Sequence, residues 1–436
     1  MEQIRLRNQK YICKTNFWIN KRCRRNRFNL LKKREYLTKG VILKNNGNLS
    51  RKLIGIFGEI TYSRASLIPA DKESSVRLLE TEGSKSIFPL DCMLGVDVLP
   101  FKITCNMMCA IAKEAVRARS YADASTNIME KHHVKLSAVQ IEKVTDYVGG
   151  LVFKDQLKQS EEAKVNLSTK VDGRHRRRRK NDILYLEIDG AMVHVRDKKN
   201  GDGWMESKHA IAFHSSDIHY YSSPDGTHEN HRILKREFVG YIGSAAEFQY
   251  HFLALAKRND YDYCSEVVVI SDGAPWIHAI VEKLVPKATH ILDLYHAKEN
   301  AGKFAQAVKK GKLQIKEFAD KLCKLIDAGK TTELLKTLEP YKDHEMPPGI
   351  LNFFTYVSNH MDCMDYPTYK AKGYFVGSGA IESGNIRLMQ NRMKLQGMRW
   401  KLSTGQGMLS LKAKYESGKW SDVNRLMQEH CYGPRS

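Results

Sequence analysis

The sequence lacks the features that mark membrane, secreted and zinc-knuckle proteins. No apolar run approaches the roughly 18–20 residues of a membrane-spanning helix, so we expect no membrane partner. The basic N-terminal stretch has no apolar core after it, so no secretory signal is predicted. The nine cysteines are scattered, and the closest pair, Cys105 and Cys109, has no second pair at zinc-site spacing. We therefore expect reduced thiols and a cytoplasmic protein.

Acidic residues are scarce relative to basic ones. The chain has 49 Asp and Glu against 71 Lys and Arg, which gives a net charge of +22. This surplus indicates a polyanionic partner, and without a membrane segment nucleic acid is preferred. The 436 residues, 42% hydrophobic and 28% charged, are typical of a globular protein with two or three domains.

The basic residues are clustered in two segments. Residues 1–50 form a predicted basic arm, which either lies on DNA or is a poorly ordered tail. The second cluster, "RHRRRRK", ends a predicted linker over residues 161–180. A run this dense does not fit a buried face, so we predict DNA phosphate contacts for its central residues: Arg176, Arg177, Arg178 and Arg179.

Two short helices are predicted at 120–149, within an N-terminal DNA-binding region over 51–160. Ser137 and Gln140 have the spacing of a capping box, and the pair Gly149-Gly150 is expected to end the second helix. The pattern fits a helix-turn-helix whose second helix enters the major groove, with Gln140 and Lys143 reading bases. An ordinary α-hairpin that packs its own core is the alternative.

From residue 183 onward, strands alternate with helices. The segments "ILYLEIDGAMVHVR", "KHAIAFHSSDI", "EVVVISDG" and "ATHILDLYHA" read as strands, the first as two runs around Asp189-Gly190. This alternation predicts a mixed α/β sheet over 181–297 and 366–420. An all-α insertion over 298–365 separates the two parts, and a tail covers 421–436.

Three carboxylates occupy notable positions in this predicted domain. Asp189 follows "LYLEI", Asp272 follows "VVVIS", and Glu382 begins a late helix. Carboxylates from separate parts of one fold suit a pair of Mg²⁺ ions, for which Mn²⁺ can substitute. Each also has a simpler explanation: a hairpin turn at Asp189, a turn or helix cap at Asp272, and a favourable first-turn charge at Glu382.

Four segments carry a family resemblance: "YLEIDGAMV", "ISDGAPWI", "HILDLYHAKEN" and "GSGAIESGNIRLMQNRMKLQGMRW". With them the chain resembles bacterial insertion-sequence transposases of the DDE class, in particular the Mutator-like ones. The resemblance implies an α/β ribonuclease-H-like mixed sheet with an all-α insertion, preceded by a helical, helix-turn-helix-like DNA-binding region. In that class the first Asp lies on the first core strand, the second Asp follows the fourth strand, and the Glu lies on a later helix.

The resemblance implies roles for individual residues. Asp189, Asp272 and Glu382 would bind two Mg²⁺ ions and catalyse the reaction. Asp293 and His296 would support that site or position DNA. Residues 385–414 contain basic residues and no acid, and are expected to form a one-sided basic helix along the DNA backbone, through Arg392, Lys394, Arg399 and Lys401. The two tryptophans nearby, Trp276 and Trp400, are expected to pack in the core.

The function implied is DNA transposition. The protein would bind terminal inverted repeats and target DNA as at least a dimer, on the bacterial nucleoid. It would catalyse cleavage and strand transfer without a covalent protein intermediate, because no nucleophilic Ser or Tyr is indicated. A structure-selective, Mg²⁺-dependent nuclease of the same fold and a non-catalytic DNA-binding protein are the alternatives.

Overall fold

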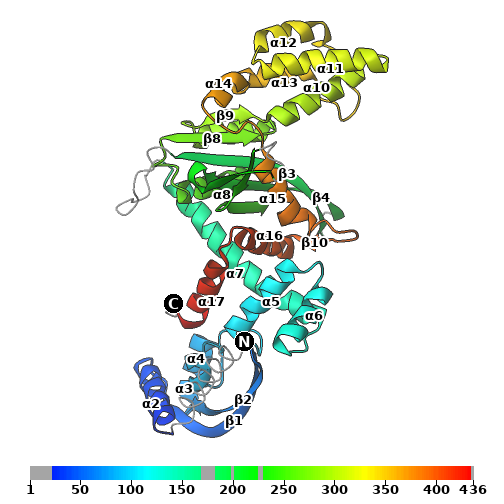
Figure 1. Ribbon diagram of the computed structural model, residues 1–436. Helices are drawn as coiled ribbons and strands as arrows, with labels where there is room; N and C mark the ends of the chain where they lie inside the picture. Colours follow the sequence, from blue (N-terminus) through cyan, green and yellow to red (C-terminus); the bar gives the residue numbers. More distant parts are fainter. Residues whose placement is uncertain (1–21, 168–181, 198–200, 224–228, 434–436) are drawn as a thin grey trace. The chain divides into compact units, whose positions relative to one another are not determined.

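The computed structural model describes residues 22–167, 182–197, 201–223 and 229–433 (Figure 1). These residues divide into two compact units. The first comprises Met1–Glu114, Tyr121–Val144 and Asn424–Ser436, and the second comprises Ala115–Ser120 and Thr145–Val423. Within the described residues, none of the helices combines the length and apolar character needed to cross a bilayer.

The first unit is built on a β-hairpin. β1 (Leu43–Gly55) and β2 (Gly58–Pro69) pair antiparallel, and the surrounding helices are α2 (Arg22–Thr38), α3 (Lys72–Glu82), α4 (Pro89–Met93) and much of α5 (Cys105–Arg117) and α6 (Tyr121–His132). The prediction of a basic arm over 1–50 is therefore wrong for its second half. Tyr36 on α2 is 2% exposed and belongs to the apolar core of this unit. Burial therefore fixes α2, although its basic composition had suggested an arm outside the core.

The second of the two predicted helices is much longer than expected. The capping box is confirmed, because Gln140 N donates to Ser137 Oγ at 3.2 Å and Ser137 N donates to Gln140 Oε1 at 2.9 Å. However, α7 runs over Ala138–Val165 and does not end at Gly149-Gly150. A Cβ atom at Gly149 would stand 2.8 Å from the backbone of Gly407, so this glycine permits a close contact between α7 and a later helix. The linker accordingly begins after α7, and Arg176–Arg179 lie outside the described residues.

A mixed six-stranded sheet forms the centre of the second unit. Its order is β7-β4-β3-β8-β9, with β10 pairing along the far part of β3. β3, β8 and β9 are parallel, whereas β4 is antiparallel to both β3 and β7. The strands are β3 (Ile183–Asp197), β4 (Gly201–His214), β7 (Glu237–Ile242), β8 (Glu266–Ser271), β9 (Thr289–Leu292) and β10 (Trp400–Lys401).

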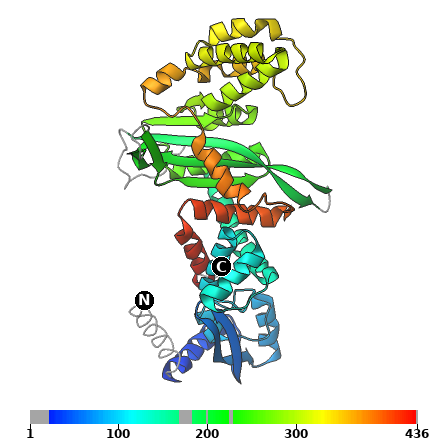
Figure 2. The same ribbon diagram turned by 45° about the vertical axis from the view of Figure 1, so that its right-hand side comes forward.

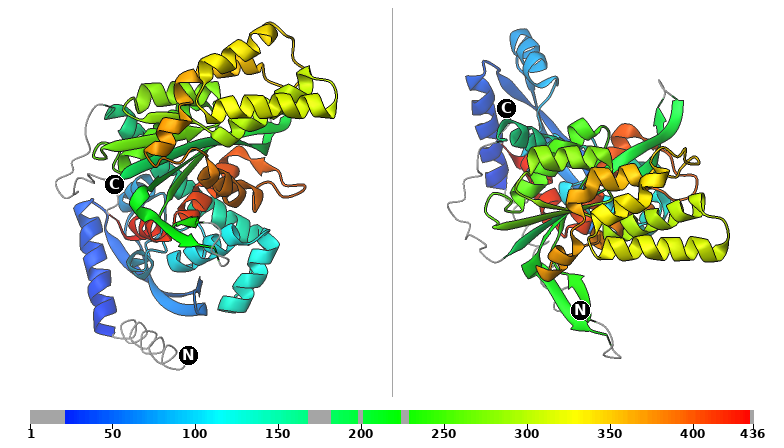
Figure 3. Two further views of the ribbon diagram at one scale, coloured as in Figure 1. Left: turned by 45° about the horizontal axis from the view of Figure 1, so that its top comes forward. Right: turned by 90° about the horizontal axis from the view of Figure 1, so that it is seen from above.

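Two ribbons extend from this sheet. β3 and β4 stay paired as far as Asp197 and Gly201, whereas the pairing of β3 with β8 stops at Ile188 (Figure 2). β5 (Ile218–Ser222) and β6 (Glu229–Ile233) form a separate two-stranded ribbon that stands away from the main sheet (Figure 3).

The buried strand predicted at 267–270 is confirmed as the core of β8, and the helix predicted from Pro275 is confirmed as α9 (Pro275–Leu284). Helices α8 (Ala245–Arg258) and α9 supply apolar side chains to the same core as β3, β4 and β8. Both tryptophans pack as expected: Trp276 lies edge-on to Phe248 with ring centroids 5.8 Å apart, and buried Trp400 donates to Met393 O at 3.0 Å.

A group of helices separates β9 from the last part of the unit. The helices α10 (Leu294–Val308), α11 (Lys312–Asp327), α12 (Thr331–Leu338), α13 (Phe353–His360) and α14 (Tyr366–Ala371) lie beyond the β9 edge of the sheet (Figures 1 and 3). Two tyrosine hydroxyls attach the group to the strand ends. Tyr356 donates to Asp272 O at 2.9 Å, and Tyr366 donates to Leu292 O at 3.0 Å.

The chain after this group is not the continuous basic helix that the sequence suggested. α15 (Gly379–Asn385) passes into a π-helical turn over Ile386–Gln390, followed by turns, β10, α16 (Leu402–Glu416) and α17 (Trp420–Tyr432). The turns between Gln390 and Trp400 bury Met393 and the indole of Trp400, so packing rather than charge decides the conformation of this segment.

A buried charge cluster attaches β7 to its neighbours. Glu237 is 3% exposed, and its carboxylate lies 3.0 Å from the guanidinium of Arg258 and 2.5 Å from the ammonium of Lys419. Burial alone would raise the pKa of Glu237, but the two cations outweigh it and hold the pKa at about 2. The carboxylate is therefore charged in the folded protein across the physiological pH range.

We expect Glu237→Gln to lower the free energy of unfolding by about 3 kcal/mol at pH 7, because it leaves two cations without their buried partner. The folded pKa lies below the ordinary value of 4.5, so this stabilisation is present above pH 4.5 and is lost as the pH falls towards 2. Denaturant unfolding at several pH values should show the difference from wild type shrinking as the pH falls from 4.5 to about 2. Glu282→Gln, a change at an exposed position of α9, is the control, and an equal loss there would contradict the assignment.

Candidate functional site

Strand register places the first two predicted carboxylates side by side. Ile188 of β3 pairs with Ser271 of β8, so Asp189 and Asp272 are the next residues on two strands about 4.8 Å apart. Asp189 lies inside β3 rather than at its end, because β3 continues against β4 to Asp197. The prediction of two runs around Asp189 is therefore wrong, and so is the hairpin alternative. What ends at Asp189 is the pairing with β8.

Asp272 leaves the sheet at the end of β8. Its Oδ1 accepts a hydrogen bond from Ala274 N at 3.0 Å, so it also stabilises the turn into α9. Gly273 follows with φ +85°, and a Cβ atom there would stand 2.7 Å from the side chain of Leu292, so both the backbone conformation and the space require glycine. A cleft opens beside this turn, and among its lining residues are Asp272, His296, Asn300, Lys303 and Tyr356.

Glu382 is carried by α15, which is fixed to β3 at two points. Glu187 Oε2 accepts from Ile381 N at 2.7 Å at the first turn of α15, and Asn385 Nδ2 donates to Asp189 Oδ2 at its end. The Glu382 side chain remains 52% exposed. This exposure leaves it available to a ligand.

A buried relay fixes the Asn385 side chain. His209 Nδ1 lies 2.6 Å from Asn385 Oδ1, and His209 Nε2 lies 2.5 Å from Ser207 Oγ. Burial lowers the pKa of His209 to about 4, so its imidazole is neutral at physiological pH. The relay connects two residues of β4 to Asp189 through α15.

The charges of Asp272 and Glu382 act on Asp189. Burial, together with the negative charges of Asp272 and Glu382, raises the pKa of Asp189 to about 6, against the lowering effects of the Gly190 N–H and His296. With this pKa the carboxyl group is still mostly ionised at neutral pH, although burial and the neighbouring negative charges oppose its ionisation. Accumulated negative charge of this kind is what a bound cation would relieve.

Asp293 and His296 form an ion pair beside Glu382. Asp293 is fully buried and caps α10, accepting from Tyr295 N at 2.7 Å, His296 N at 2.9 Å and Ser378 N at 2.6 Å. Burial would raise its pKa, but the hydrogen bonds with His296 and Ser378 outweigh that effect and hold it at about 2. These donors fix the start of α10 and the backbone of Ser378 beside His296.

His296 is the cation of this group. Its Nδ1 lies 3.5 Å from Asp293 Oδ2 and 3.8 Å from Glu382 Oε1. The contact with Asp293 raises the pKa of His296 to about 9 against the effect of burial, and Glu382 and Asp272 contribute in the same direction. The imidazolium therefore carries a positive charge beside Glu382 at neutral pH.

Glu187 and Asn385 are site residues that the sequence interpretation missed. Glu187 is fully buried, and burial together with the charges of Asp293 and Glu382 raises its pKa to about 8, although the Ile381 N–H opposes this. The signal for Glu187 was present in the sequence, since residues i and i+2 of a strand share a face and Asp189 was already a candidate. For Asn385 the corresponding signal is its position one helical turn after Glu382.

The predicted DNA-contacting residues have different outcomes. Arg392 is 1% exposed, donates to Ala115 O at 3.0 Å and lies over the Trp400 ring, so its packing excludes the predicted contact with DNA phosphate. Exposed side chains are found at Lys143, Lys394, Arg399 and Lys401. Gln140 is also exposed, with its amide oxygen occupied by the capping box.

Comparisons with known proteins identify relatives without stating an activity. Residues 39–429 match the family described as "Uncharacterised protein family (UPF0236)". The chain is also 23% identical, over 379 residues, to the "UPF0236 protein in vanSb 3'region" of Streptococcus gallolyticus. That similarity covers 85% of this chain and 73% of the relative.

Replacing Glu187 tests its contact with α15. Glu187→Ala removes the buried acceptor of the Ile381 N–H and should lower the free energy of unfolding by about 1–3 kcal/mol. Glu187→Gln keeps an acceptor of the same shape and should remain within about 1 kcal/mol of wild type. Thermal unfolding of the two variants at neutral pH provides the comparison. Equal stability of both variants would mean that this contact does not hold α15.

Proposed function

The chain belongs to the uncharacterised protein family UPF0236, and we propose that it is a DDE-type transposase that cleaves and joins DNA with divalent metal ions. The observation that carries the proposal is the register that places Asp189 beside Asp272, with the charges of Asp272 and Glu382 both acting on Asp189. They come from a central strand, the end of its parallel neighbour and a helix more than a hundred residues later in the sequence. A buried carboxylate surrounded by other carboxylates is costly to keep unless it serves a ligand.

The order of these residues along the fold supports a ribonuclease-H-like core. In chain order the main sheet begins β3, β4, β7, β8, so Asp189 lies on the first strand and Asp272 directly follows the fourth. Glu382 lies on α15, beyond the helices α10–α14. This is the arrangement that the resemblance to DDE transposases implies.

The donor set suits a hard cation. Asp189, Asp272 and Glu382 offer only oxygen atoms, which Mg²⁺ and Mn²⁺ prefer. Bound in a pair, such ions would activate the attacking oxygen and stabilise the leaving oxygen of a phosphodiester. Asn385 would orient Asp189, and Glu187 would hold α15 so that Glu382 faces the same site.

The remaining residues would position DNA. His296 places a positive charge at the cleft, and Lys303 lies in its lining, so both could contact a phosphate. The exposed Lys394, Arg399 and Lys401 follow Glu382 in the chain and would hold the backbone of the bound strand. Cleavage and joining would both be in-line displacements at phosphorus, in which water and then a DNA 3′-hydroxyl attack.

Asp272→Asn should abolish both cleavage and joining while preserving binding to DNA ends, because it removes a metal ligand without removing a basic contact. The assay uses labelled DNA taken from the sequence on either side of the gene, with Mg²⁺ or Mn²⁺, and separates cleaved from strand-transferred products. Glu282→Gln, a charge removal on the exposed side of α9, should leave both products unchanged.

The same assay separates the alternatives. Cleavage without joining by the wild-type protein would identify a nuclease. Binding without metal-dependent cleavage would identify a non-catalytic DNA-binding protein. Wild-type rates in Asp272→Asn would remove Asp272 from the catalytic site, and loss of DNA binding in that variant would indicate a folding defect.

We expect the basic segments to have different roles in DNA binding, one contacting phosphates and the other contacting bases. Changing Arg176–Arg179 to Ala should weaken binding to repeat and random DNA alike, and reduce the slope of log K against log salt by about 0.9 per lost phosphate contact. Changing Lys143 to Ala should instead reduce the difference in binding free energy between repeat and random DNA by about 1–3 kcal/mol if Lys143 contacts a base. Salt titrations on both DNAs measure both effects. An equal loss on both DNAs for Lys143→Ala would make the helix structural.

A further inference from the structure

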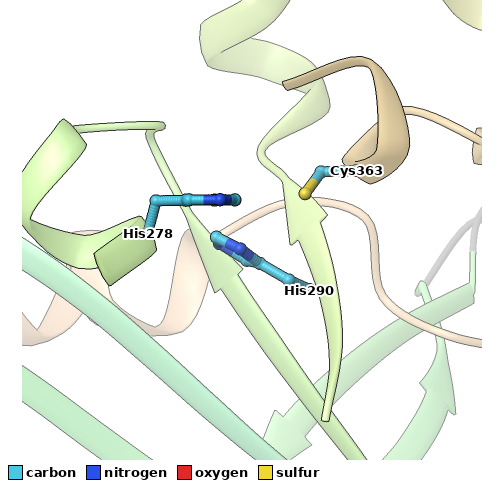
Figure 4. A group of neighbouring side chains, drawn as sticks. All are labelled: His278, His290 and Cys363. Carbon is cyan, nitrogen blue, oxygen red and sulfur yellow. The ribbon is translucent and has the colours of Figure 1, made fainter. Parts of the chain in front are cut away.

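A second cluster of metal-ligating side chains consists of two histidines and a cysteine. His278 of α9, His290 of β9 and Cys363 of the short 3₁₀ turn Met361–Cys363 point toward one another (Figure 4). One ligand atom from each lies within 4.8 Å of the other two. These residues come from three elements of the second unit, and no contiguous sequence motif joins them.

We propose that His278, His290 and Cys363 bind a zinc ion. Imidazole nitrogens and thiolates are the donors that zinc prefers, whereas Mg²⁺ prefers oxygen donors. At ordinary Zn–N and Zn–S bond lengths, tetrahedral ligand atoms stand about 3.5 Å apart, so small side-chain rotations would bring this cluster to binding distance. Three protein ligands leave a fourth position for water.

The imidazole of His278 supports the assignment independently. Its Nδ1 is buried, and among the described residues it has no hydrogen-bond partner. A buried polar nitrogen without a partner costs about 1–3 kcal/mol in folding unless a ligand satisfies it. The ring lies in a group of histidines, with centroids 5.5 Å from that of His290 and 6.0 Å from that of His360.

His290 has the environment of an oriented, neutral ligand. Its Nε2 lies 2.9 Å from Ser271 Oγ, and metal-binding histidines commonly use such a contact to fix the ring. Burial, with the neighbouring His278 and His360, lowers the pKa of His290 to about 4, so no proton has to leave its ring before a metal binds. Burial raises the pKa of Cys363 to about 11, so formation of a zinc–sulfur bond would release the thiol proton to solvent.

The position of the cluster suggests a structural role. Cys363 closes the turn after α13, His278 lies on α9, and Ser271 immediately precedes Asp272. A zinc ion here would join the helical group α10–α14 to the sheet beside the turn that carries Asp272. The proposal does not depend on the transposase reaction, since a protein with another activity would be stabilised in the same way.

The test uses the full-length protein, freed of any histidine tag and loaded with zinc or cobalt(II). We expect about one equivalent of tightly held zinc per chain, and with cobalt a thiolate-to-metal charge-transfer band together with the intense visible bands of a tetrahedral site. Cys363→Ser should abolish the charge-transfer band, whereas Cys323→Ser, at another cysteine of the helical group, should leave it intact.

Two further variants keep the outcome decisive. His278→Gln should weaken zinc binding at least about tenfold even if Cys363→Ser folds poorly. Asp189→Asn combined with Asp272→Asn should retain the zinc and the cobalt band, which separates this site from the carboxylates. Wild-type protein without a cobalt–thiolate band, or a band that survives in Cys363→Ser, would overturn the proposal.

Discussion

The parallel pairing of β3 with β8 is the interaction on which the candidate site depends. Its register, from Ile183–Glu266 to Ile188–Ser271, brings Asp189 and Asp272 to adjacent positions where the pairing ends. A shift of β8 by one residue would turn Asp272 to the opposite face of the sheet, whereas Asp189 would stay where the pairing of β3 with β4 holds it. The apolar residues Val267–Ile270 prevent such a shift, because they are buried and would lose their core contacts.

The end of β8 carries residues of both candidate sites. Asp272 follows β8 beside Asp189, and Ser271 contacts the imidazole of His290 on the neighbouring strand. Successive residues at the end of one buried strand thus serve the carboxylate group and the histidine–cysteine group. Hard and borderline metal ions would be sorted by the donors that each group offers rather than by distance along the chain.

Local sequence patterns predicted local structure well and long-range structure poorly. The strand at 267–270, the helix from Pro275 and the capping box at Ser137 follow from burial and turn chemistry in short windows. The helix end at Gly149 was wrong because this glycine permits a contact with Gly407, which no short window contains. Arg392 was assigned to DNA from its charge, whereas the folded chain buries its guanidinium over Trp400.

The contact of Gly149 with Gly407 also has a consequence for synthesis of the chain. The backbone of Gly149 can meet that of Gly407 only after roughly 260 further residues have been translated. At about 5–20 residues per second this takes tens of seconds. During that interval the glycine-bearing face of α7 has no partner helix. The nascent second unit therefore presents an uncovered surface to chaperones until its last helices leave the ribosome.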